Sequence, residues 1–220
     1  MNPAFRQGAR DSAVIALAAA AFGVAYGVLA VDAGFTPALA LFSSAVIVSG
    51  AAQFSLVGLL PAGPVAVLVA VTGLGLRHLP MSAKLAELIG PQRLTTRLRL
   101  AFILVDETFG LTVRAADRGQ HDLASYKSGA DLTVYGCWLL ATAAGAWLGA
   151  AIDPAAAGVG VLFGLLFLGL AAPFVRTRRD LLVAVSAIVA TLIAMRVLPS
   201  AWQLTTAAVV ATLVGMVGDE

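Results

Sequence analysis

The sequence has little charge, two histidines and one cysteine. Only 12% of its 220 residues are charged, whereas soluble domains carry about 25%. Because Cys137 is the only cysteine, an intrachain disulfide is excluded. The sequence contains no HExxH, Walker, GxSxG or GxGD pattern, and a membrane hydrolase built on Ser49 and His78 would lack a nucleophile motif. We therefore expect no enzyme, no cofactor and no metal site. Basic residues occur in short clusters between apolar runs, so no nucleic-acid partner is expected.

Apolar residues dominate the composition of the chain. Hydrophobic residues make up 60% of the chain, above the roughly 45–50% of soluble domains. A helix needs about 20 apolar residues to cross a bilayer. The chain is thus predicted to be one polytopic α-helical membrane domain, 1–220, with up to eight segments and an uncleaved first helix: 13–33, 38–60, 63–79, 98–116, 132–152, 155–175, 180–198 and 200–217. Tyr126, Tyr135, Trp138 and Trp202 lie near predicted segment starts, where aromatic rings anchor helices at the membrane surface.

The basic residues between segments predict the orientation. With the N-terminus in the cytoplasm, eight crossings place Arg114, Arg118 and Lys127 in one cytoplasmic loop. Strict counting puts the basic stretch from Arg77 to Arg99 outside, against the rule. The conflict disappears if segments 63–79 and 98–116 are both incomplete or re-entrant.

Two adjacent acids, Asp106 and Glu107, interrupt the apolar run LAFILVDETFGLTV. Each acidic residue at the middle of a membrane helix costs about 2.5–3.5 kcal/mol, which roughly cancels the apolar gain of this segment. One interpretation makes the acids a proton and ammonium site. The alternative is a structural ion pair with Arg77 or another base.

Other polar groups lie close to these acids in sequence. Ser49 and Gln53 are predicted on one helical stripe with Ala45, for substrate contact or for helix packing. Gly73, Gly75 and Pro80 weaken the helix where Arg77 and His78 occur, as in broken helices that bind ions or carboxylates. Arg77 is predicted to clamp a carboxylate or, alternatively, to extend to the lipid headgroups.

Small residues recur in two predicted helices. Gly23 and Gly27 are echoed by Gly145 and Gly149, and each pair precedes an acidic residue and a proline. This echo predicts an internal repeat, while helix packing is the better interpretation of the first pair. Tyr26 lies between Gly23 and Gly27 and is a candidate binding residue.

The motifs FGVAYGVLA, SGAAQF, LGLRHLPMSAKL and VDETFGL occur in an order that resembles the AzlC family of branched-chain amino acid exporters. The similarity runs from residue 5 to about residue 115. It implies a bacterial inner-membrane protein that works with a small membrane subunit of the AzlD type. Asp106, Glu107 and Gln53 match polar positions of the family. Gly75 stands where the family usually has an asparagine, which removes one candidate ligand.

The resemblance implies a secondary transporter that exports valine, leucine, isoleucine or a similar zwitterion, and the two acids together with the lack of a nucleotide-binding motif favour coupling to protons. Predicted substrate-binding residues are Tyr26, Ser49, Gln53, Arg77, Asp106 and Glu107, with the two acids also carrying the proton. The substrate's apolar side chain is expected among Phe22, Tyr26 and Phe54. The alternative is a non-transporting scaffold or assembly subunit whose buried acids form structural ion pairs.

Overall fold

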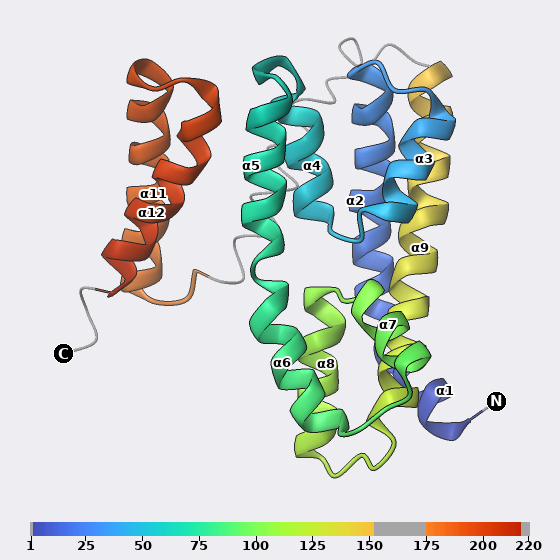
Figure 1. The fold of residues 1–220 in the computed structure, drawn as a ribbon. Coiled ribbons are helices and arrows are strands. Elements are labelled where there is room, and N and C mark those ends of the chain that lie inside the picture. The colour runs from blue at the N-terminus through green and yellow to red at the C-terminus, as the bar shows by residue number, and fades with distance from the viewer. Residues whose placement is uncertain (1, 152–174, 217–220) are drawn as a thin grey trace. The chain divides into compact units, whose positions relative to one another are not determined.

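A computed structural model describes residues 2–151 and 175–216, and the secondary structure in this part of the chain consists of helices joined by short connections (Figure 1). Contacts divide the chain into two compact units, Met1–Phe54 with Leu74–Pro154, and Ser55–Gly73 with Ala155–Glu220. Four described stretches are long and apolar enough to cross a membrane: Ala13–Asp32, Pro64–Ile89, Leu123–Ala151 and Arg178–Val197. The predicted all-α membrane bundle is confirmed. The predicted segment 155–175 lies outside the described residues.

Helices α1 (Pro3–Asp11) and α2 (Ala13–Asp32) run parallel to the long helix α9 (Leu123–Ala151) (Figure 1). Helix α9 starts nine residues before its predicted start at 132, because Asp122 caps it by accepting a hydrogen bond from the Ser125 amide at 3.0 Å. Asn2 caps α1 and also donates to Asp122 at 2.8 Å. The two helix starts are therefore joined.

Glycines permit the close approach of α2 and α9. A Cβ on Gly27 would overlap the Thr142 carbonyl, and one on Gly145 would overlap the Val24 carbonyl. Gly23 and Gly149 make similar contacts along the same interface. This contact explains the glycine echo in the sequence, since each helix supplies one side of the interface. The internal repeat itself stays a prediction.

The predicted continuous span 38–60 is wrong. It consists of two short helices, α3 (Pro37–Val46) and α4 (Gly50–Leu59), followed by a 3₁₀ turn at Leu60–Ala62. Ser44 donates to Gln53 across the break at 3.3 Å, so the chain doubles back. Each helix has 10 residues, half the length that a crossing needs. Residues 37–59 thus form a re-entrant hairpin.

The predicted helix break near Arg77 is confirmed. Helix α5 (Pro64–Gly75) ends two residues before α6 (His78–Ile89) begins. Together they form a stretch of 26 residues, about 39 Å long at 1.5 Å per residue. The predicted segment 63–79 therefore continues to Ile89 and is long enough to cross a bilayer core of about 30 Å.

Segment 98–116 is not one continuous helix, which fits one half of the condition set by the charge pattern, whereas segment 63–79, the other half, belongs to a stretch long enough to cross. Segment 98–116 comprises α7 (Leu94–Phe102) and α8 (Asp106–Asp117), which are separated by three non-helical residues. On α7, Arg99 donates to Ser128 near the start of α9. On α8, Ala115 packs with Leu123 and Tyr126, so the chain returns to the same end.

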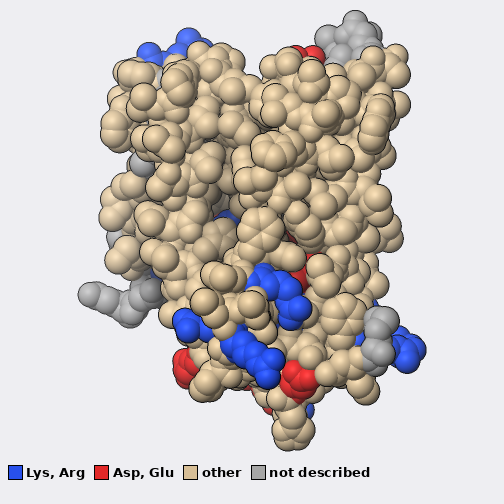
Figure 2. Space-filling view, turned by 45° about the vertical axis from the view of Figure 1, so that its right-hand side comes forward, with Lys and Arg blue, Asp and Glu red and all other residues tan. Residues whose placement is uncertain are grey.

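The basic stretch from Arg77 to Arg99 returns to the side of the N-terminus. Leu88 and Ile89, at the end of α6, pack against the cluster that contains Ala4 and Leu123. Most charged side chains in the view of Figure 2 gather toward its lower end, below extended uncharged surface. The charge pattern therefore fits a topology in which Pro64–Ile89, which is long and apolar enough to cross a membrane, brings the basic stretch to the side of the N-terminus.

The described part of the second unit contains a helical hairpin. Helix α11 (Arg178–Val197) packs on α12 (Ser200–Met216). Arg179, at the start of α11, donates to the carbonyl of Gly215, near the end of α12. The start of α11 carries a capping box in which Thr177 and Asp180 each bond the other's backbone amide. Helix α11 corresponds to the predicted span 180–198 and is long and apolar enough to cross a membrane, whereas the apolar part of α12, Thr206–Met216, is shorter than a crossing needs.

Candidate functional site

Three helix breaks meet at one side chain, Arg77. This residue lies in the break between α5 and α6. Its Nη1 atom is 2.9 Å from Oδ2 of Asp106, the first residue of α8, and its Nη2 atom donates to the Ser49 hydroxyl at 3.1 Å. Ser49 immediately precedes α4. One guanidinium therefore joins the turning points of both re-entrant hairpins.

Local hydrogen bonds explain the first break. Ser49 caps α4 by accepting from the Ala52 amide at 3.4 Å. Gln53 donates from its side-chain amide to the Ile47 carbonyl, and Tyr135 donates to the Ala45 carbonyl at 2.8 Å. These side chains satisfy backbone groups that a continuous helix would have paired. The predicted stripe of Ala45, Ser49 and Gln53 on a single helix is wrong for the same reason.

The adjacent acids lie in the first turn of α8, not in the middle of a helix as predicted. The free amides and the dipole of a helix N-terminus stabilise negative charge there. Asp106 faces Arg77. Because successive residues of a helix point about 100° apart, the adjacent Glu107 points in another direction. In the described part of the chain, the exposed side chain of Glu107 has no hydrogen bond or ion pair.

The Arg77–Asp106 pair is open on the isolated chain, with side-chain exposures of 38% and 44%. In contrast, the Nε atom of Arg77 is buried and has no acceptor among the described residues. A guanidinium has five N–H donors and binds carboxylates in two-pronged fashion. The pair thus offers a cation with spare donors beside an anion. That combination suits a small zwitterion.

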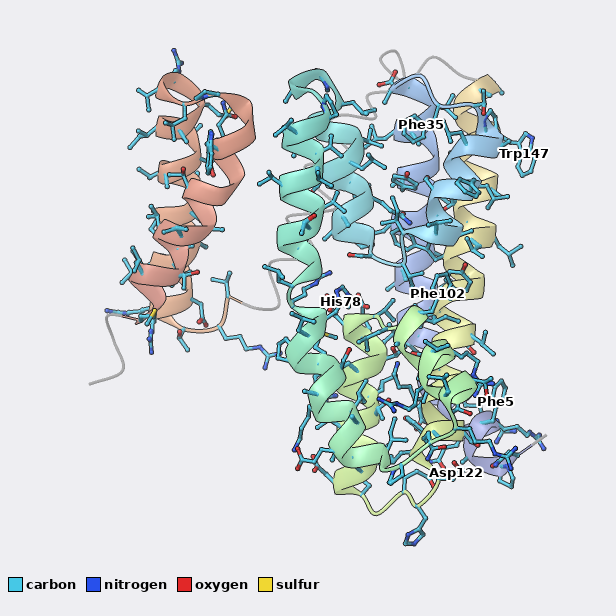
Figure 3. The ribbon with its side chains drawn as sticks, in the orientation of Figure 1. Phe5, Phe35, His78, Phe102, Asp122 and Trp147 are labelled. Atoms are coloured by element: carbon cyan, nitrogen blue, oxygen red, sulfur yellow. The ribbon has the colours of Figure 1, made fainter. Side chains whose placement is uncertain are left out.

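His78 is the residue after Arg77 and starts α6, as Figure 3 shows at the junction with α5. Its Nδ1 atom lies 3.1 Å from the Gly75 carbonyl oxygen. This contact satisfies one of the backbone carbonyls released by the break. Within the described residues, no group of three His, Cys, Asp or Glu side chains is arranged to hold a metal ion.

A buried polar and aromatic cluster lies behind the first hairpin. Trp138 donates from Nε1 to the Gln53 side-chain oxygen at 3.1 Å, and its ring packs edge-on against Phe54. Phe54 in turn packs edge-on against Tyr26, with ring centroids 5.8 Å apart. Gln53 and Tyr26 are fully buried. Phe22, the third residue predicted beside the substrate's side chain, is half-buried on α2.

The buried side chains are already committed to partners inside the protein. Ser43 donates its own proton to the Ala40 carbonyl at 2.7 Å, so the Tyr26 hydroxyl donates to Ser43, also at 2.7 Å. Ser44 lies 3.0 Å from the Thr142 hydroxyl of α9. The structure therefore places Tyr26 and Gln53 as supports of the hairpin, while Ser49, Arg77 and Asp106 form its accessible edge.

Trp138 and Tyr135 have a role that differs from the predicted one. Both were predicted as anchors at the membrane surface, because α9 was predicted to start at 132. With its start at Leu123, they lie in the middle of the helix and bond to the turn of the first hairpin. A polar atom on each ring was the available signal, since buried Tyr and Trp usually have a hydrogen-bond partner.

A second ion pair was also missed. Lys127 was counted as a loop charge, but it is buried inside α9, and its ammonium lies 2.7 Å from both carboxylate oxygens of Asp131. The side-chain exposures are 0% and 3%. Removing one member of a buried pair is destabilising by about 3–5 kcal/mol, because the other charge is left unpaired. The signal in the sequence was the four-residue spacing of opposite charges.

Comparisons with known proteins give the family of the chain. Residues 14–152 match the family described as AzlC protein, which is more than half of the chain. An uncharacterized membrane protein of Archaeoglobus fulgidus is 30% identical over 152 residues, corresponding to 67% of this chain and 64% of that protein. The chain thus spans less than two thirds of the length of this relative. No solved structure matches the chain. Both re-entrant hairpins and both ion pairs fall within the matched range, and the chain is a membrane protein that belongs to the AzlC family.

Proposed function

We propose that this protein is a secondary transporter that exports branched-chain amino acids across the bacterial inner membrane. The family supports transport of such amino acids as the activity, and the proposal includes a small membrane partner of the AzlD type and coupling to protons. The observation that carries it is the Arg77–Asp106 pair at the meeting point of two re-entrant hairpins. Broken helices of this kind form substrate sites in many secondary transporters.

The substrate is expected to replace the ion pair with its own charges. Its carboxylate would bind Arg77 and the free amides at the start of α4, where the helix dipole favours an anion. Its ammonium would bind Asp106. The amino acid brings one positive and one negative charge to a site that has one of each. The net charge of the site therefore stays the same when the amino acid binds. This exchange explains why an ion pair suits a site that must bind and release.

The apolar side chain of the substrate is assigned to the aromatic wall of Phe54 and Trp138. Gly50 contributes because a Cβ at this position would lie 2.9 Å from the Trp138 ring. Apolar contacts separate neighbouring aliphatic side chains only modestly, by about 1–3 kcal/mol per methylene. We therefore expect a transporter with a preference among valine, leucine and isoleucine and no absolute choice.

The competing function is a non-transporting scaffold in which Arg77–Asp106 only ties helices together. Both functions require the observed pair, but they differ in the effect of removing its charge. Valine efflux is measured in cells that express the chain with its small partner, after preloading through a valine-containing dipeptide. We expect Asp106→Asn to abolish efflux while the protein level in the membrane stays normal. Glu107→Gln is measured in parallel as the second predicted proton carrier, and Glu87→Gln, in the exposed Lys84–Glu87 pair of α6, is the matched control.

Loss of the Asp106→Asn protein from the membrane would favour the scaffold. If wild type does not accelerate the efflux of valine, leucine or isoleucine, the proposed substrate class is wrong. The sequence-based assignment of proton coupling to Asp106 or Glu107 stays a prediction, and the same variants test it through the pH dependence of efflux.

A further inference from the structure

The buried Lys127–Asp131 pair has no part in the substrate site described above. Both residues belong to α9 and lie one helical turn apart. An ion pair within one helix does not tie that helix to a neighbour, so it adds nothing to the cohesion of the bundle. Buried ion pairs are often no more stabilising than apolar residues of the same size. The pair therefore calls for a role other than stability, and ionisable groups inside membrane segments are usually functional.

Groups from two neighbouring helices face the pair. From α7, Arg99 donates to Ser128 at 3.0 Å and is close enough to attract the Asp131 carboxylate. From α8, the Thr108 side chain lies close to the Asp131 carboxylate and donates its hydroxyl proton to the Val105 carbonyl at 3.1 Å. Thr108 is fully buried. The α7–α8 hairpin thus covers the pair and separates it from water.

On the other described helices that pack on α9, the charged side chains lie at the surface or bind other groups, and Arg6 and Arg10 of α1 are exposed. On α1, the Asp11 carboxylate accepts a hydrogen bond from Tyr126 at 2.8 Å. On α6, Lys84 and Glu87 pair with each other on the surface. The ionisable residues of α2 are Tyr26, bound to Ser43, and Asp32 at its far end, and α3 has none.

The first turn of α8 connects the two ion pairs. Asp106 starts this turn and binds Arg77, while Thr108, two residues later, faces Asp131. A helical turn moves as a rigid piece. Any displacement of Asp106 when a substrate takes its place on Arg77 therefore also moves Thr108 relative to Asp131. Substrate exchange at one pair is in this way mechanically linked to the cover over the other.

We infer that the Lys127–Asp131 pair is the proton-coupling site of the transport cycle, an inference that rests on the proposed function. When the α7–α8 hairpin moves away from α9, water reaches the pair and one proton binds to a carboxylate oxygen of Asp131. An O–H bond forms, and Lys127 keeps its proton. When the proton leaves, that O–H bond breaks and the ion pair with Lys127 forms again. One proton is thus bound and released in each cycle.

The inference is tested with right-side-out membrane vesicles from cells that express the full chain with its small partner. The vesicles are loaded with labelled valine. Exchange against external valine at equal pH measures substrate binding and movement, and efflux into acidic medium measures proton coupling. The variant Lys127→Gln/Asp131→Asn removes both charges together, so no unpaired charge is left buried. The matched control Lys84→Gln/Glu87→Gln removes an exposed pair.

We expect the buried-pair variant to keep exchange within about twofold of wild type and to lose the acceleration of efflux by external acid. The exposed-pair control should keep both activities. Retained acceleration in the buried-pair variant, or its absence from the membrane, would assign the pair to folding and overturn the inference. Loss of acceleration in Glu107→Gln alone would move the coupling site to that acid, and would also overturn it. A wild type without valine exchange would instead refute the proposed function, and the inference with it.

Discussion

Arg77 and Asp106 form an ion pair 2.9 Å long although they lie in different helix breaks, one within α5–α6 and one at the start of α8. The same guanidinium also donates to Ser49, so three segments share one cation. A contact shared by three segments depends on the planar guanidinium of arginine, which has several donors. A lysine would carry the charge but would present one compact ammonium on a flexible stem.

The variant Arg77→Lys is therefore expected to bind substrate more weakly without being lost from the membrane. A charge-assisted hydrogen bond contributes about 1.5–3 kcal/mol, and each 1.4 kcal/mol is about tenfold in affinity. The valine concentration for half-maximal exchange should rise about tenfold or more. Arg97→Lys, an equal change on the exposed surface of α7, serves as the control. An unchanged half-maximal concentration in Arg77→Lys would show that the guanidinium does not contact the substrate.

Gln53 is predicted to stabilise the turn of the first hairpin. In Gln53→Leu, the Ile47 carbonyl loses the Gln53 amide as a partner, while the Trp138 ring N–H keeps only its longer hydrogen bond to Ser44, at 3.3 Å. Each unpaired buried group costs about 1–3 kcal/mol, and 1 kcal/mol corresponds to about 2–4 °C in Tm for a chain of this size. Thermal unfolding in detergent should shift down by several degrees. Gln7→Leu, on the exposed face of α1, should leave the Tm close to wild type, and equal values for both variants would contradict the assignment.

The two re-entrant turns were not predictable from local sequence. The residues in them are Ile47, Val48 and Ser49 in one, and Ile103, Leu104 and Val105 in the other. Neither turn contains proline or glycine, the usual signals of a helix end. The first turn is fixed by side chains of Gln53 and Tyr135 that bond its backbone, and Tyr135 is distant in sequence. Tertiary contacts thus override a continuous apolar pattern.

The break at Arg77 was predictable because Gly73, Gly75 and Pro80 mark it. The closeness of Arg77 to Asp106 was foreseen as one alternative, since a membrane acid needs a base. The buried Lys127 was not foreseen. The polar residues before 132 were interpreted as a loop, although Asp122 provides an N-cap and the four-residue spacing from Lys127 to Asp131 lets the charges neutralise each other inside a helix.

The α2–α9 interface predicts opposite changes in Tm for alanine substitutions at two glycines of α9. In Gly145→Ala, the new methyl group would overlap the Val24 carbonyl, so the helices must separate and the Tm should fall by several degrees. In Gly136→Ala, no atom of the described residues lies within 4 Å of the new Cβ. Alanine is favoured over glycine in a helix by roughly 0.5–1 kcal/mol, so this variant should match or exceed wild type. The contact would be refuted by a stable Gly145→Ala protein.

The joint between α1 and α9 is expected to weaken in acid. Hydrogen bonds from the Ser125 amide and hydroxyl, and from Asn2, lower the pKa of Asp122 from its usual 3.8. A lowered pKa in the folded state means that this stability is present above about pH 4 and is lost as the pH falls through the folded-state value. Asp122→Ala should lower the Tm at pH 6, and the difference from wild type should shrink below about pH 4.

Asp117→Ala is the control for this pH dependence, because Asp117 is exposed near the end of α8. It should not change the Tm at either pH. A gap between Asp122→Ala and wild type that stays constant down to pH 3 would mean that the carboxylate charge is not what caps α9.

The re-entrant hairpins predict which loops share a side of the membrane. Single cysteines are placed at Gln7, Ala33, Ala86 and Thr95 in a Cys137→Ala background and treated with a membrane-impermeant thiol reagent. Ala86→Cys and Thr95→Cys should be labelled from the same side as Gln7→Cys, because the end of α6 packs beside Ala4 and Leu123. Ala33→Cys, after the C-terminal end of α2, should be labelled from the opposite side.

Labelling of Ala86→Cys and Ala33→Cys from one side would mean that α5 and α6 do not cross between the hairpins. The turning points would then not meet from opposite faces, and Arg77 would lose its place between Ser49 and Asp106. The labelling pattern thus tests the geometry on which the substrate site depends, without reference to which amino acid is carried.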